Sequence, residues 1–133
     1  MNQEKYLDYI VEETQKVLAI DSPTGYTASA AEFVMEEYRK LGYEPQMTTK
    51  GGVFVDLGGE NKEDGLVLAA HIDTLGAMVC EVKSNGNLKV SPLGGMNPNN
   101  AEAENCRIVT RFDGVYSGTF QLNNASIHVN GEY

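Results

Sequence analysis

LVLAAHIDTLG, residues 66–76, joins a continuous apolar run to a histidine and an aspartate. Five consecutive apolar residues are typical of a short strand that is covered on both faces, as the interior strands of an α/β sheet are. We therefore predict an interior strand over residues 66–70 of an α/β fold. Ligands of open α/β sheets gather beyond the carboxyl ends of the strands, and His71 and Asp73 follow this strand directly.

His71 and Asp73 form a His-x-Asp pattern that suits a metal site. A metal-binding imidazole presents one neutral nitrogen to the ion, and an acceptor beside the other nitrogen holds the proton and orients the ring. We predict that His71 is a metal ligand and that Asp73 orients it or contacts a ligand nearby. The pattern has only three residues, so a capped or partly solvated histidine is the alternative. The other histidine, His128, is expected on the solvent face of a strand.

Two amphipathic helices are predicted before this run. Apolar residues three and four apart, with charged residues between them, indicate a helix over residues 3–20. The loop DSPTG, residues 21–25, ends this helix, and we expect it to be a plain connector. A second helical pattern extends from residue 27 or 29 to residue 41, with a possible capping box at Ser29 and Glu32.

Glycines separate the elements that follow the second helix. Gly42 is expected to end that helix in a left-handed conformation. Extended segments are predicted over residues 43–48 and 53–57. The adjacent glutamates of the two helices, Glu12-Glu13 and Glu36-Glu37, are expected on solvated helix faces rather than as catalytic carboxylate pairs.

Beyond Thr74 the pattern changes to short strands and tight turns. Asn85-Gly86 and Asp113-Gly114 are strong hairpin signals between strand-like segments. Residues 94–100 are rich in turn formers and are expected to form an irregular loop. The predicted strands cover residues 77–82, 88–90, 107–112 and 115–122. We therefore place a boundary near Thr74, between residues 1–73 and an all-β part, residues 74–133.

The composition excludes several classes of protein. The 133 residues carry 10 Lys+Arg against 19 Asp+Glu, and a net charge of −9 disfavours binding to nucleic acid or to anionic membranes. No apolar run approaches the roughly 20 residues that span a bilayer, and the N-terminus has no basic and apolar leader, so we expect a cytoplasmic protein. Cys80 and Cys106 are expected to be reduced thiols. Phosphate-binding glycine loops and the GxSxG nucleophile motif are absent from the sequence.

The order of these elements, together with the run from His71 to Val79, resembles the glutamyl-aminopeptidase and tetrahedral-aminopeptidase family. These are co-catalytic, two-metal metallopeptidases, and some members carry the name endoglucanase. The resemblance covers the N-terminal part of a family member. It implies a zinc-exopeptidase-like α/β catalytic domain over residues 1–73, followed by part of a β-rich, PDZ-like insertion domain over residues 74–133.

The resemblance also implies roles for the two residues of the motif. His71 would be a ligand of one of two divalent metals, zinc or cobalt, and Asp73 would be its catalytic-site partner. The family's bridging aspartate, its general-base glutamate and its remaining ligands would lie beyond Tyr133. Because a two-metal hydrolase needs several carboxylates and histidines, we expect the 133-residue chain to be inactive by itself.

The function predicted from the sequence is therefore the N-terminal portion of a metal-dependent aminopeptidase. Its complete form would hydrolyse N-terminal residues from peptide substrates and would assemble as a homo-oligomer. A metal-dependent carboxypeptidase or deacylase is the rival enzyme, because a His-x-Asp-Thr also follows a buried strand there. A non-catalytic, β-rich assembly module is the alternative of another class, because strand edges in the second half would need partners.

Overall fold

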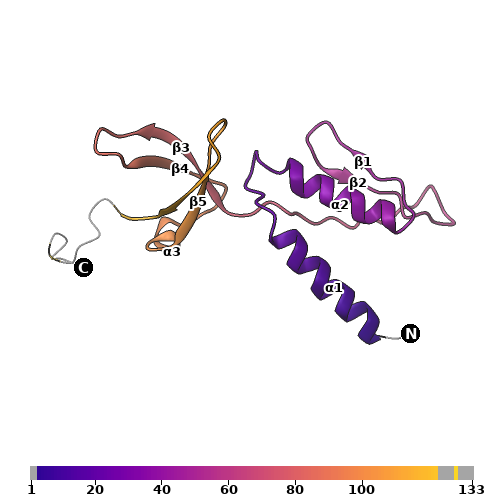
Figure 1. The fold of residues 1–133 in the computed structure, drawn as a ribbon. Coiled ribbons are helices and arrows are strands. Elements are labelled where there is room, and N and C mark those ends of the chain that lie inside the picture. Colours follow the sequence, from indigo (N-terminus) through magenta and orange to yellow (C-terminus); the bar gives the residue numbers. More distant parts are fainter. Residues whose placement is uncertain (1–2, 123–127, 129–133) are drawn as a thin grey trace. The chain divides into compact units, whose positions relative to one another are not determined.

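The computed structural model describes residues 3–122 and residue 128. The chain divides into two compact units, Met1–Ala77 and Met78–Tyr133, which we describe separately. Helices and strands are both present, in agreement with the α/β class (Figure 1). No helix among the described residues is long and apolar enough to cross a membrane.

Both predicted helices of the first unit are confirmed. Helix α1 spans Gln3–Leu18 and helix α2 spans Ala28–Lys40. Gly42 follows α2 with a φ of 90°, the left-handed conformation expected at this position. The capping box is wrong: α2 already begins at Ala28, so Ser29 lies inside the first turn and cannot be the N-cap.

Helix α2 carries the small core of the first unit. Ala30, Ala31 and Met35 are its buried apolar residues. The helix packs against α1 and against strand β2 (Val53–Phe54), which Figure 1 shows beside it. Strands β1 (Gln46–Met47) and β2 (Val53–Phe54) pair in antiparallel fashion and are shorter than the predicted segments.

The predicted interior strand over residues 66–70 is wrong for the described chain. These residues form no strand, and Leu66, Val67 and Leu68 are 87%, 81% and 80% exposed. A central strand needs hydrogen-bonded neighbours and a cover on both faces. The described residues contain only two-stranded sheets, and none of them includes this run. The apolar composition of residues 66–70 therefore predicted a strand for which the described residues supply no neighbouring strands.

The second unit is built from short strands, as predicted. Its elements are β3 (Gly76–Val82), which begins in the first unit, β4 (Leu88–Leu93), α3 (Pro98–Ala101), β5 (Asn105–Val109) and β6 (Val115–Thr119). Its sheets pair β3 with β4 and β5 with β6. In the turns, the Lys83 N–H donates to the Asn87 carbonyl at 2.8 Å and the Thr110 N–H donates to the Gly114 carbonyl at 2.9 Å.

Two details of this unit differ from the prediction. The loop over residues 94–100 contains the start of α3, because the Asn97 side chain accepts from the Asn99 N–H at 3.1 Å and Pro98 occupies the first turn. His128 is exposed and lies in a turn. Its predicted strand neighbours, Ile127 and Val129, lie outside the described residues.

Candidate functional site

His71 and Asp73 are in direct contact. The distance from His71 Nδ1 to Asp73 Oδ1 is 3.0 Å, and the two side chains are 84% and 45% exposed. With the proton on Nδ1, the imidazole donates to the carboxylate and its Nε2 lone pair is available to an external ligand. This is the geometry of a histidine oriented by a carboxylate.

The loop over residues 21–25 lies against this motif, so it is more than a connector. The Thr24 hydroxyl donates to Asp73 Oδ2 at 3.2 Å. The Thr74 N–H donates to the Ser22 carbonyl at 2.8 Å, and Pro23 forms a parallel bridge with Thr74. With the proton of His71 on Nδ1, both carboxylate oxygens of Asp73 accept hydrogen bonds, one from His71 and one from Thr24.

Gly76 allows the loop to approach this closely. A Cβ atom on Gly76 would lie 2.5 Å from Cβ of Pro23, well inside normal contact. The glycine after the His-x-Asp motif thus has a packing role: it leaves space for the proline ring. No sequence pattern predicted the contact of Thr24 with Asp73 or that of Pro23 with Gly76, although both segments contain a proline or a glycine.

The described residues offer a possible nitrogen ligand but do not form a metal site by themselves. Neutral imidazole nitrogen suits zinc and related divalent ions, and His71 presents such a nitrogen. Zinc sites use three or four protein ligands, and no group of three or more His, Cys, Asp or Glu side chains among the described residues could hold a metal ion. Within the described residues, the chemistry of His71 therefore suits one ligand of such an ion and no more.

Three of the four adjacent helix glutamates, Glu12, Glu13 and Glu37, form ion pairs with lysines of their own helices. Lys16 Nζ lies 2.7 Å from Glu12 Oε1 and 2.8 Å from Glu13 Oε1. The hydrogen bond from Lys16 lowers the pKa of Glu12, and the two glutamates raise the pKa of Lys16. Lys40 pairs with Glu37 in the same way. The prediction of solvated faces is confirmed for Glu12 and Glu36, which are exposed. It is wrong for Glu13 and Glu37, whose side chains are only 18% and 17% exposed, and Glu13 Oε2 is buried with no hydrogen-bond partner among the described residues.

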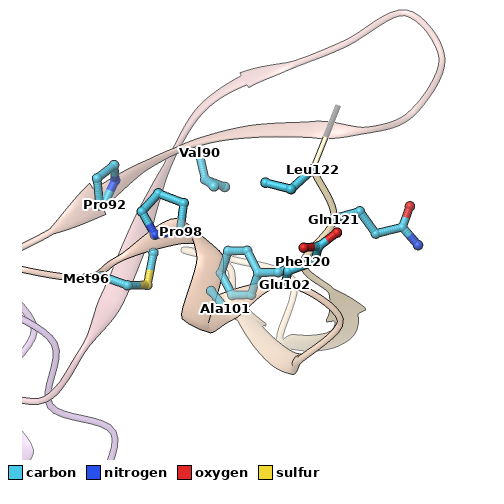
Figure 2. Close-up of a pocket in the computed structure, with 9 residues that line it drawn as sticks. All are labelled: Val90, Pro92, Met96, Pro98, Ala101, Glu102, Phe120, Gln121 and Leu122. Atoms are coloured by element: carbon cyan, nitrogen blue, oxygen red, sulfur yellow. The ribbon is translucent and has the colours of Figure 1, made fainter. Parts of the chain in front are cut away.

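A separate cavity of about 130 Å³ lies within the second unit (Figure 2). Its lining is mostly apolar and comes from β4, α3 and the segment after β6; Gln121 extends away from the other labelled side chains. No residue of the His71 motif lines it. The lining includes Val90, Pro92, Met96, Pro98, Phe120 and Leu122.

Both cysteines are free: Cys80 is exposed and Cys106 is half-buried.

Comparison with known proteins identifies the class. The family model of the M42 glutamyl aminopeptidases matches residues 51–132. The chain is 35% identical over 119 residues, 90% of its length, to the Bacillus subtilis (strain 168) protein named "Putative aminopeptidase YhfE". It is 27% identical over 103 residues, 77% of its length, to the "Glutamyl aminopeptidase" of Lactococcus lactis subsp. cremoris (strain MG1363).

The chain belongs to the M42 glutamyl aminopeptidase family. Peptidases of this family are generally metal-dependent. The chain covers 34% and 29% of the two relatives, so it spans about a third of the length of the curated relatives that it matches.

Proposed function

We propose that the chain is the N-terminal portion of a metal-dependent aminopeptidase whose complete form removes N-terminal residues from peptides. The family membership supports the reaction class. The single observation that carries the site is the 3.0 Å contact between His71 Nδ1 and Asp73 Oδ1, which leaves Nε2 for a metal. In this proposal His71 is a ligand of a zinc or cobalt ion, and Asp73 is the catalytic-site residue that orients it.

The metal would act as a Lewis acid on the peptide carbonyl and would lower the pKa of a water molecule. The residues of this chain would hold and orient one metal ligand, His71. Asp73 holds the proton on His71 Nδ1 and fixes the plane of the ring. The β-rich unit, Met78–Tyr133, corresponds in this proposal to part of a PDZ-like insertion domain that assembles the enzyme into a cytoplasmic homo-oligomer.

Assay of the native species tests this function. The protein would be isolated from its source cells with an antibody to α1, and its intact mass would be compared with 14.5 kDa. We expect a much heavier species that releases N-terminal residues from free peptides and loses this activity on treatment with a chelator. A heavier species that cleaves only acylated amines or C-terminal residues would instead support the deacylase or carboxypeptidase alternative.

A non-catalytic assembly module is the second candidate, and the strand edges favour it. Each sheet among the described residues has only two strands, so every strand leaves one edge without a partner strand there. Such edges tend to pair with other chains. A native species of 14.5 kDa that forms oligomers in light scattering would support this candidate, and a sharp monomer peak at high concentration would contradict it.

A further inference from the structure

The loop over residues 21–25 makes more contacts with the His-x-Asp motif than a connector requires. Thr24 and Asp73 are 49 residues apart in the sequence, yet the Thr24 hydroxyl donates to Asp73 Oδ2 at 3.2 Å. Asp73 Oδ1 faces His71 Nδ1 at 3.0 Å. The carboxylate therefore connects a threonine hydroxyl on one side with an imidazole on the other.

The hydrogen bond from Thr24, added to the contact with His71, restricts the orientation of the Asp73 carboxylate. The terminal torsion of an aspartate is broad, so one hydrogen bond from His71 leaves the carboxyl plane free to turn. With both oxygens held, by Thr24 and by His71, the plane is defined. The acceptor then faces the imidazole nitrogen continuously, which fixes the tautomer.

The backbone around Thr24 is itself held in place. The Thr74 N–H donates to the Ser22 carbonyl at 2.8 Å, and the Tyr26 N–H donates to the Pro23 carbonyl at 2.7 Å. Pro23 packs against Gly76, where no Cβ could be accommodated. Thr24 therefore follows two residues, Ser22 and Pro23, that are fastened to the motif, and it lies inside a turn closed by the Tyr26–Pro23 hydrogen bond.

We propose that Thr24 is a positioning residue that orients the Asp73 carboxylate, and through it selects the His71 tautomer with the proton on Nδ1, which leaves the Nε2 lone pair for a metal ion. This inference rests on the proposed function, because the selected tautomer serves catalysis only if His71 binds a metal. The orienting effect itself belongs to this chain and can be measured without metal or substrate.

The first test is the tautomer of His71 in the 133-residue chain, read from long-range ¹H–¹⁵N spectra of histidine-labelled protein at a pH where the ring is neutral. Thr24→Val removes the hydroxyl and retains the branched shape. We expect the share of His71 with the proton on Nδ1 to fall about two- to fivefold, as for the loss of one net hydrogen bond. Thr24→Ser restores the donor and should retain the wild-type share.

Thr27→Val is the matched control, because Thr27 is nearby and its side chain makes no capping hydrogen bond. It should leave the tautomer unchanged, and His128 provides an internal reference in every spectrum. An unchanged His71 tautomer in Thr24→Val would overturn the proposal. An equal change in Thr24→Ser would overturn it as well, because the hydroxyl would then not be responsible.

The second test uses Zn²⁺ alone as the probe, in a form of the protein with the length of its relatives. Residues that orient a metal ligand typically change affinity by about 10–100-fold. We expect Thr24→Val to weaken Zn²⁺ binding by about tenfold and Thr24→Ser to bind like the wild type. A tautomer change without any change in Zn²⁺ affinity would retain the role of Thr24 but contradict the proposed function. If neither the His71 tautomer nor the Zn²⁺ affinity changed in Thr24→Val, the proposed role of Thr24 would be rejected.

Discussion

Ser22 shows how tightly the loop is packed at the scale of single residues. It is 1% exposed, and its hydroxyl has no hydrogen-bond partner among the described residues. A buried, unpartnered hydroxyl costs about 1–3 kcal/mol. Ser22→Ala is therefore expected to raise the free energy of unfolding by about 1 kcal/mol, measured by urea denaturation. A clear loss of stability would show that this hydroxyl has a partner.

Gly76 is the residue on which the approach of the loop depends. Gly76→Ala would place Cβ 2.5 Å from Cβ of Pro23. Because the loop must then move, we expect a loss of about 1–3 kcal/mol in the free energy of unfolding. Gly65→Ala is the matched control, since nothing lies within 4 Å of the added Cβ. Equal stability of the two variants in the same denaturation experiment would contradict the close contact.

His71 and Asp73 were accessible to sequence reasoning, whereas Thr24 was not. The two motif residues are separated by one position and follow an apolar run, so their chemistry can be read locally. The contact of Thr24 with Asp73 joins positions 49 residues apart. Such a pair depends on tertiary structure, and no periodicity or turn signal in a single sequence reports it.

At the scale of elements, the β5–β6 hairpin offers a test by pH. The Tyr116 hydroxyl donates to Asp113 Oδ2 at 2.6 Å, and this hydrogen bond raises the pKa of Tyr116 above its usual value of 10.0. A raised folded-state pKa means that the bond stabilises the hairpin below pH 10 and that this contribution is lost as the pH rises through the folded pKa.

Asp113→Ala removes the acceptor of this bond. We expect the pKa of Tyr116 to fall toward its usual value, since its first cause is the hydrogen bond to Asp113. NMR titration of the Tyr116 ring measures this directly, and Tyr26, in the other unit, serves as the unaffected reference. An unchanged Tyr116 titration in Asp113→Ala would mean that the hydrogen bond is absent in solution.

The elements with local signals were predicted well and those with distant partners were not. Periodicity defined α1 and α2, and the Asn-Gly and Asp-Gly turns marked the two hairpins of the second unit. Helix α3 was missed although Asn97-Pro98 is a recognisable start signal. The strand over residues 66–70 was predicted from apolar composition alone, and composition does not supply neighbouring strands.

At the scale of the whole molecule, the exposed run Leu66–Leu68 predicts a different effect of substitution in this chain and in a form with the length of the relatives. Val67 is 81% exposed in this chain, so Val67→Thr should change the free energy of unfolding by less than about 0.5 kcal/mol. In a form with the length of the relatives, a strand covered on both faces would bury Val67, and the same substitution should cost about 1–3 kcal/mol. Small effects in both forms would contradict an interior strand.

Metal content is the most direct measure of the central claim, that His71 is a metal ligand in a metal-dependent aminopeptidase. It would be determined by elemental analysis of purified protein with the length of the relatives, for the wild type, for His71→Ala and for His128→Ala as the control histidine. We predict that His71→Ala loses at least one metal ion per chain and most of the peptidase activity, whereas His128→Ala retains both. Full metal content and activity in His71→Ala would contradict the account.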